Sequence, residues 1–379
     1  MYKLPGQEEF LFYILYTGAA VLSLIACCYL LFRRGNAFAP DIKSSARMRR
    51  WTAALFASTT LSHAWYFPGV FLTSDDDIVL HDLVGGLLDS ITVIPLSIAV
   101  MFCMLQDRRR PLWPAWAMVA PLVVGVTVCI ATRSYAALPM ILAYLLLLGI
   151  GILIHMVRAI RQYGHWLRDN YADLEHKEVW QSFIVMAFLL LISGIYEVGF
   201  DWPAYDYVVQ VLGIVVVCYL VWRIETLSDL SIPIQSEKAI AVDDIAEETV
   251  TTENVEDSDY PLSMRNNIGP LLKQYCEDPQ LYLQYDITLS QLAQTIGTNR
   301  LYLSQHFSSQ GLTYNAYING LRIQHFINLY HEKVATHQPI SAQQLAYQSG
   351  FRSYNTFSVA FKKMKGMTVT EWMRPPISA

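Results

Sequence analysis

The chain has 379 residues, of which 54% are apolar and only 16% charged, and its formal net charge is -5. This composition excludes an ordinary soluble globular protein and an intrinsically disordered one. The six cysteines show no Cys-x-x-Cys or Cys/His spacing, which argues against a disulfide framework and a zinc site.

Long apolar runs fill the first 224 residues. A helix needs about 20 such residues to cross the hydrocarbon core of a bilayer. Runs of this length occur at 10–32, 51–72, 79–105, 112–131, 135–157, 180–199 and 204–224. The sequence therefore predicts an all-α fold with a seven-helix transmembrane domain over residues 1–224. The first run lacks a basic start and a cleavage site, so we expect an anchor and not a signal peptide.

Lys and Arg residues are distributed unevenly among the connecting loops. The first, third and fifth loops hold 13 of them, whereas the N-terminal tail and the even-numbered loops hold only Lys3 and Arg133. The positive-inside rule then places the N-terminus outside and the C-terminus in the cytoplasm. We expect a multi-pass protein of the bacterial inner (cytoplasmic) membrane. A retinal photoreceptor is excluded because no lysine lies between Lys177 and Lys238 to form a Schiff base.

Several ionisable residues fall within the apolar runs. Placing an ionisable side chain inside a bilayer costs free energy, so each of these residues is a candidate for function. Most of them fall toward the outer half of the expected membrane, where a polar pocket would suit a small molecule or an ion. The candidate sensor pocket consists of His63, His81, Asp82, Asp89, Glu197 and Asp206. The alternative is that these residues simply face water near the span ends. Their spacing matches no metal motif, so we expect no metal.

Residues 225–262 carry eleven acidic side chains against Lys238 alone. Low hydrophobicity with one sign of charge predicts an extended acidic linker between two domains. A second hypothesis is that its carboxylates compete with DNA phosphates for a basic surface.

The last part of the chain, residues 263–379, contains two helix–turn–helix patterns, at about 288–308 and 340–363. In the first, apolar residues at helical spacing end at Gly297, and Asn299 can cap a second helix that runs to about Phe307. In the second, Ile340, Leu345 and Ala346 mark a helix that ends at Gly350. Another helix follows from about Ser353 to Lys363, with Phe357 and Phe361 facing inward. A joining helix through Arg322 would separate two reading helices by about one turn of DNA.

Three sequence motifs in this region resemble those of the AraC/XylS family of bacterial transcription regulators. They are Leu-Ala-x(3)-Gly-Thr-Asn-Arg-x-Tyr-Leu-Ser, Gly-x-Thr-x(3)-Tyr-Ile-Asn-x-Leu-Arg-Ile and Gly-Phe-x-Ser-x(2)-Thr-Phe-x(3)-Phe-Lys-Lys. The resemblance covers about residues 263–379. It implies an all-α, bipartite domain that binds promoter DNA through one reading helix in each unit.

The resemblance also implies which side chains face the DNA. In the first reading helix they are Asn299, Arg300, Leu301, Ser304 and Gln305. In the second they are Arg352, Ser353, Tyr354, Asn355, Thr356 and Val359, followed by phosphate contacts from Lys362, Lys363 and Lys365. The chain departs from the family at Gln305 and Val359, where many members carry arginine, and at Phe326, where a small residue is common. Gln305 and Asn355 can each read adenine in bidentate fashion.

The sequence contains no glycine-rich phosphate loop and no nucleophile elbow, so we expect neither an enzyme nor a cofactor. The leading hypothesis is a membrane-bound one-component transcription regulator, with double-stranded DNA and the lipid bilayer as partners. A homodimer would present two such domains to DNA. Two alternatives stay open: a transporter or channel with a regulatory helix–turn–helix domain, and a membrane anchor with a protein-interaction module.

Overall fold

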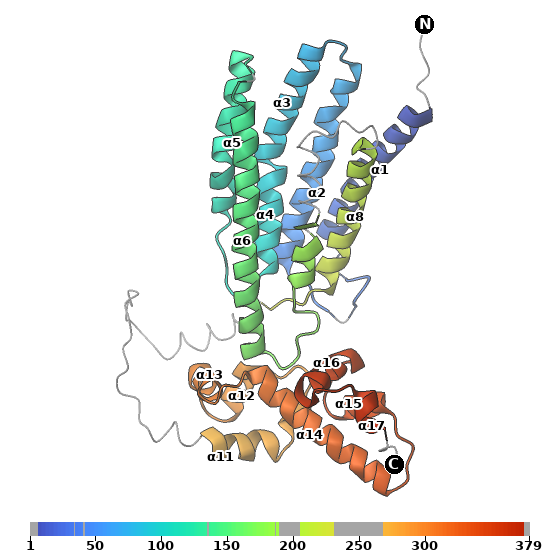
Figure 1. Ribbon diagram of the computed structural model, residues 1–379, viewed down its shortest axis with the longest axis vertical. Helices are drawn as coiled ribbons and strands as arrows, with labels where there is room; N and C mark the ends of the chain where they lie inside the picture. The colour runs from blue at the N-terminus through green and yellow to red at the C-terminus, as the bar shows by residue number, and fades with distance from the viewer. Residues whose placement is uncertain are drawn as a thin grey trace, which may run out of the picture. The chain divides into compact units, whose positions relative to one another are not determined.

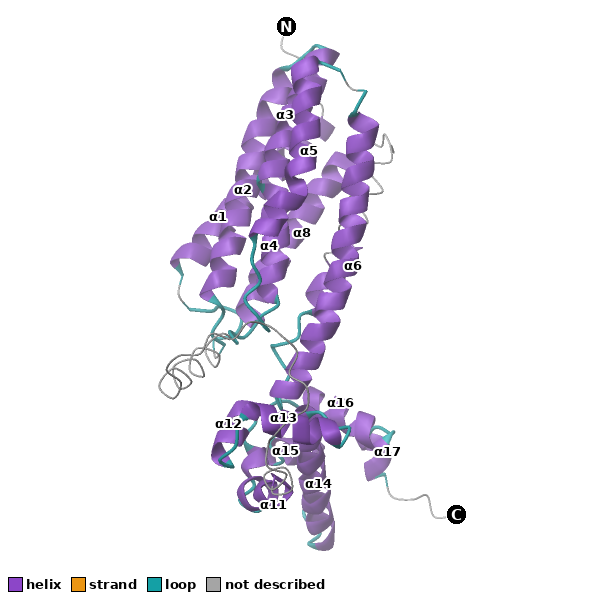
Figure 2. Ribbon diagram, turned by 90° about the vertical axis from the view of Figure 1, so that its left-hand side faces the viewer, coloured by secondary structure: helices purple, strands orange, loops and turns teal. Residues whose placement is uncertain are grey.

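The computed structural model describes residues 7–33, 35–40, 42–134, 136–185, 187–188, 205–230 and 268–374. It divides into two compact units. The first comprises Met1–Tyr163 and His176–Asp244, and the second comprises Gly164–Glu175 and Ile245–Ala379, within the limits of the described residues. Helices dominate the described parts of both units, and no strand appears there beyond one isolated bridge (Figure 2).

The first unit is a bundle of long helices that run side by side (Figure 1). Its elements are α1 (Gln7–Phe32), α2 (Ala46–Tyr66), the 3-10 helix η1 (Phe67–Phe71), α3 (Asp75–Ile91), α4 (Val93–Met104), α5 (Trp113–Thr132), α6 (Leu138–Asn170) and α8 (Tyr205–Thr226). Helix α2 packs against α1, α3, α4 and α8, and α5 packs against α3 and α4. The last turns of α6, from Gly164, belong to the second unit.

Five stretches of helix in the described residues are long and apolar enough to cross a membrane. They are Phe10–Phe32, Asp75–Met104, Trp113–Thr132, Leu138–Asn170 and Tyr207–Thr226. They correspond to five of the seven expected spans. The expected span at 180–199 lies mostly outside the described residues, and α2, at the position of the second span, is not among the five.

Helix α2 is less apolar because of where it lies. Thr52 and Ser58 are buried between helices and do not face the surroundings of the bundle. A helix with neighbours on most sides contributes little of the outer surface, so its sequence does not need to match lipid. Small polar side chains at such positions allow close packing between helices.

The expected span 79–105 consists of two helices with a break at Thr92. Pro95 has no backbone N–H to donate to the carbonyl of Ile91, and a proline ring clashes with that carbonyl in a regular helix. The bonds on either side are present, from Thr92 N to Leu88 O and from Leu96 N to Thr92 O. One proline therefore accounts for the break.

Glu225 was expected to begin a solvated acidic linker, but it lies at the end of α8 with none of its surface exposed. Its Oε2 accepts from the backbone N–H groups of Ala37 (2.8 Å) and Phe38 (3.2 Å), and its Oε1 lies 3.8 Å from Arg49 Nη1. Residues 225–230 therefore belong to the packed first unit. The carboxylate satisfies amides of the loop between α1 and α2 that would otherwise be buried without partners. The expected linker beyond residue 230 lies outside the described residues.

The second unit is built around one long helix, α14 (Tyr314–Ala335). Its other elements are α11 (Ile268–Leu272), η2 (Lys273–Glu277), η3 (Leu281–Leu283), α12 (Leu289–Thr295), α13 (Arg300–Ser309), α15 (Ala342–Gln348), α16 (Tyr354–Lys365) and α17 (Val369–Met373). The first half of α14 joins an apolar core formed by α11, α12 and α13, and its second half joins another formed by α15, α16 and α17. Figure 1 shows the two groups of short helices along α14.

Arg322, near the middle of α14, is only 1% exposed. Its Nε donates to the carbonyl of Tyr282 (2.8 Å), and its Nη2 donates to those of Gln284 (2.8 Å) and Tyr285 (3.3 Å). Burial lowers the pKa of Arg322 to about 10, opposed by the charges of Asp173 and Asp286. Arg322 thus ties the connection between η3 and α12 to the joining helix and is not available to DNA.

Candidate nucleic-acid interface

The first helix–turn–helix unit forms where the sequence predicts it. Thr288 and Gln291 make a capping box that starts α12. Gly297 follows the helix with φ +71°, a conformation that L side chains rarely adopt. Asn299 then starts α13 by accepting a hydrogen bond from Tyr302 N (2.9 Å). Leu303 and Phe307 on α13 are buried against α12, as expected.

This packing turns the opposite face of α13 outward. Leu301 and Gln305 are exposed, one turn apart on that face, and Arg300 and Ser304 beside them are half-buried. Of the five expected DNA-facing residues, Asn299 has a clear structural role as well, because its side chain is the helix cap. The remaining four form a compact polar strip with one exposed leucine.

The second unit repeats this plan. Ser341 caps α15, and Gly350 ends it with φ +85°. A Cβ at Gly350 would lie 2.7 Å from the backbone of Leu283, so the turn requires glycine for space as well as for conformation. Ser353 then caps α16 by accepting from Thr356 N (3.3 Å). Ile340, expected in the first helix of this unit, lies before that helix and is exposed.

Helix α16 buries Phe357 and Phe361 and exposes the opposite face. Asn355 and Val359 lie one turn apart there, with Val359 64% exposed. Lys362, Lys363 and Lys365 are exposed in the last turn, where cations also interact favourably with the helix dipole. The helix ends at Gly366 in the left-handed conformation.

Three other residues expected to face DNA make contacts within the protein. Arg352 Nη1 lies 4.0 Å from Asp286 Oδ2, and its guanidinium lies over the ring of Tyr285. Tyr354 packs against Phe357 in the second core. Thr356 Oγ1 donates to Glu175 Oε2 (3.0 Å). Asn355, Val359 and the lysines are therefore the most accessible part of this surface.

Phe326, one of the departures from the family, fills the second core. Its ring lies 4.5 Å from that of Phe357 and 5.8 Å from that of Phe361, measured between centroids. A large side chain is accommodated at this position because neighbouring aromatic rings pack around it.

Helix α14 joins the two helix–turn–helix units. Helix α14 has 22 residues, which at 1.5 Å per residue gives a length of about 33 Å. This is close to one helical turn of B-DNA, about 34 Å.

Comparison with known proteins agrees with this geometry. The family described as a helix-turn-helix domain matches residues 292–375. Residues 292–375 of this chain are an AraC-type helix–turn–helix domain. The matched residues include α13 and α16, the two helices expected to read DNA.

Similar proteins include the HTH-type transcriptional activator RhaR of Salmonella heidelberg (strain SL476), of Salmonella typhi and of Salmonella arizonae. Each is 35% identical to this chain over 71 residues, which is 18% of this chain and 23% of the relative. The chain thus spans about a quarter of the length of these relatives. No solved structure matches it.

Cys276, in η2 of the second unit, is fully buried in the core around α12 and α13. Burial raises the pKa of its thiol to about 12, so it is a packing residue and not a reactive thiol.

The candidate sensor residues of the first unit separate into two groups. His63 Nε2 lies 3.1 Å from Gln210 Oε1 of α8, and the rings of His63 and Tyr16 lie 4.7 Å apart. Tyr16 OH also donates to the carbonyl of His63 (2.6 Å), and Asp89 of α3 lies within electrostatic range of the His63 side chain. This group, referred to below as the His63 cluster, therefore joins α1, α2, α3 and α8.

Of the other candidates, His81 and Asp82 border the His63 cluster through Tyr66, which interacts with both Asp82 and Asp89. His81 Nε2 lies 3.2 Å from the carbonyl of Tyr66, and Asp82 beside it is exposed. Glu197 lies outside the described residues. Asp206 lies in α8, and its side chain is not among those described.

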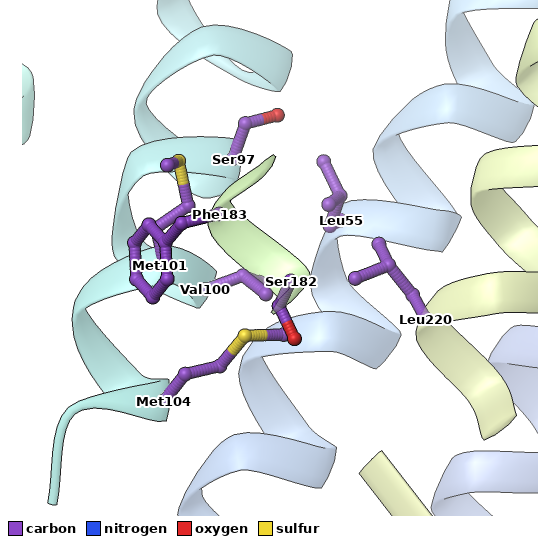
Figure 3. A pocket seen from close by; sticks show the side chains of 8 residues that line it. All are labelled: Leu55, Ser97, Val100, Met101, Met104, Ser182, Phe183 and Leu220. Atoms are coloured by element: carbon purple, nitrogen blue, oxygen red, sulfur yellow. The ribbon is translucent and has the colours of Figure 1, made fainter. Parts of the chain in front are cut away.

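A small cavity between helices lies elsewhere in the first unit. Its volume is about 10 Å³, and it is lined by Leu55, Ser97, Val100, Met101, Met104, Ser182, Phe183 and Leu220 (Figure 3). It is too small for an organic ligand, and the His63 cluster does not line it.

Sequence reasoning missed three residues with clear roles: Glu225, Arg322 and Glu175. Arg322 belongs to one of the three motifs that resemble the family, but its position among the apolar residues of the helix does not indicate that it is buried. Glu225 follows a long apolar run, which is a weak signal for a structural acid. Nothing in the sequence links Glu175 to Thr356, which lies 181 residues later.

Proposed function

We propose that this protein is a membrane-bound, one-component transcription regulator that binds promoter DNA through α13 and α16. The observation that carries the proposal is the match of residues 292–375 to a helix-turn-helix family, together with the exposed faces of α13 and α16 in the two units that α14 joins. The apolar helices of the first unit are consistent with a membrane region in the same chain.

In the proposed topology, seven helices cross the membrane and the AraC-type domain lies in the cytoplasm. The supporting observation is the distribution of 13 basic residues among alternate loops. A DNA-binding domain requires this orientation.

The proposed sensor is the His63 cluster. Polar groups between membrane helices are costly unless they bind each other or a ligand. An ion or small molecule that changed the His63–Gln210 contact would bias the packing of α8 against α2. Such a signal acts only if it favours one arrangement of the helices over the other.

The test uses the full chain in lipid nanodiscs, mixed with genomic fragments of its host over a salt series. We expect enrichment of discrete fragments, with an affinity that falls steeply as salt rises. If the folded protein binds no DNA at any salt concentration, the proposal is contradicted and a protein-interaction module is favoured. Solute flux through the protein in proteoliposomes would instead favour a transporter.

Two substitutions on α16 distinguish base reading from phosphate contact. Asn355→Ala should weaken binding to the preferred site by about 1–3 kcal/mol and relax its sequence preference. Lys363→Ala should weaken binding to all sequences alike and reduce the salt dependence by about one phosphate contact. Exposed Gln324, on the joining helix, provides a control as Gln324→Ala.

A further inference from the structure

Residues 164–175 lie far from the AraC-type domain in the sequence but belong to the same compact unit. Ala172 is only 1% exposed and is part of the apolar core formed with α12 and α13. The core of the first helix–turn–helix unit is therefore completed by a residue that precedes α12 by more than a hundred positions.

Directional hydrogen bonds hold this segment in one register. Tyr171 and Thr288 form an isolated antiparallel bridge, and Ala172 N donates to the carbonyl of Ile287 (3.4 Å). Asn315 Nδ2, in the first turn of α14, donates to the carbonyls of Ala172 (2.7 Å) and Tyr171 (3.3 Å).

Three residues after Ala172, the same segment contacts the second helix–turn–helix unit, at α16. The carboxylate of Glu175 accepts a hydrogen bond from Thr356 at the N-terminal end of α16. A helix N-terminus is a favourable place for an anion, because its backbone N–H groups and its dipole point outward. A DNA phosphate that approached this end of α16 would meet the carboxylate first, and the two negative charges repel each other.

We propose that residues 171–175 form an intramolecular clip, which occupies part of the DNA-facing surface at Thr356 and is displaced when DNA binds. The inference rests on the proposed function. Clip and DNA then compete, so any change that withdraws the clip raises DNA affinity, and DNA weakens the clip to the same extent.

The clip also has a direct connection to the apolar helices. Its first residue, Tyr171, follows Asn170, the last residue of α6, and Tyr171 N donates to the carbonyl of Leu167 in that helix. Helix α6 is continuous from Leu138 and is one of the five helices able to cross a membrane. A rotation or shift of α6 would therefore act on Ala172 two residues beyond its end.

The experiment measures affinity for an enriched DNA fragment with the full chain in nanodiscs. Glu175→Gln removes the charge of the clip, and Asn315→Ala removes the two side-chain hydrogen bonds to the carbonyls of Tyr171 and Ala172 without changing charge. Glu178→Gln is the matched control, because Glu178 lies three residues further on and its carboxylate accepts from Trp180 of the first unit. We expect both clip variants to bind DNA about five-fold more tightly or better, with the control within two-fold of the unmodified protein.

Hydrogen exchange at the amide of Ala172 provides a second measurement. This amide should be protected in the free protein and should exchange faster once DNA is bound. Equal affinities for the unmodified protein and both clip variants would overturn the clip and leave the proposed function intact. Failure of every variant to bind DNA would overturn the proposed function, and the clip with it.

Discussion

Large apolar side chains are distributed differently over the surfaces of the two units. In the AraC-type domain, Leu292, Leu303 and Phe357 are buried in compact cores. In the first unit, large apolar residues such as Val124, Leu146 and Leu147 are exposed on the outside of the bundle. Both units have buried apolar cores, but the first unit also exposes large apolar residues on helices that are long and apolar enough to cross a membrane.

Buried charges show a second contrast. Arg322 binds backbone carbonyls in the AraC-type domain, whereas Glu225 binds backbone amides in the first unit. The positive guanidinium donates to carbonyl oxygens of its loop, and the negative carboxylate accepts from N–H groups of its loop. Both units therefore use one buried charge to order irregular backbone.

The largest effect is expected in an aromatic core. Phe326→Ala leaves a cavity among Phe357, Phe361 and Trp372 and should destabilise the AraC-type domain by about 3–5 kcal/mol. Hydrogen exchange of the full chain, read separately for α14–α16 and for α1–α5, measures this change. Met364→Ala, at an exposed position of α16, is the control. An equal loss of protection from exchange in both units would contradict the inference that the two units have separate cores.

A somewhat smaller effect is expected for the buried acid of the first unit. Glu225→Gln removes the charge opposite Arg49 and weakens two amide contacts, which should cost about 2–3 kcal/mol. Proteolysis of the loop between α1 and α2 in nanodiscs should become faster. Asp76→Asn, at an exposed site, should leave the rate unchanged. An unchanged rate for Glu225→Gln would show that this carboxylate does not order the loop.

The two turn glycines of the second helix–turn–helix unit provide a matched pair. Gly350→Ala combines a positive φ with a contact to the backbone of Leu283 and should cost about 2 kcal/mol or more. Gly366→Ala has a similar φ of +75° but open space around its Cβ, so about 1 kcal/mol is expected. Thermal unfolding of the full chain in nanodiscs compares them. Equal shifts would mean that backbone conformation alone sets the cost.

The smallest effect is a pH dependence confined to the AraC-type domain. Burial lowers the pKa of His306 and of His325 below the usual value. As pH falls below about 6.5, the unfolded chain binds protons at these residues before the folded chain does, so stability falls until pH passes the folded pKa. The double variant His306→Gln/His325→Gln should lose this dependence between pH 7 and pH 5. If the double variant keeps the same pH dependence of stability, other titratable groups cause it.

Local patterns in the sequence determined much of the AraC-type domain. The glycines at 297 and 350, the caps at Asn299 and Ser353, and the apolar spacing within each helix act over a few residues. Such signals are readable without a fold because their physical cause is local. Length and composition predicted seven membrane spans, and five of them correspond to described helices that are apolar enough to cross a membrane.

The tertiary structure alone decided which polar residues are buried and what they bind. Glu225 resembles the other acids of residues 225–262 in the sequence, yet it is fully buried against the loop after α1. Ala172 and Glu175 carry no pattern at all, yet they contact α12, α14 and α16. These contacts join residues more than a hundred positions apart, and the free energy of such a contact depends on the partner's position, which no local pattern records.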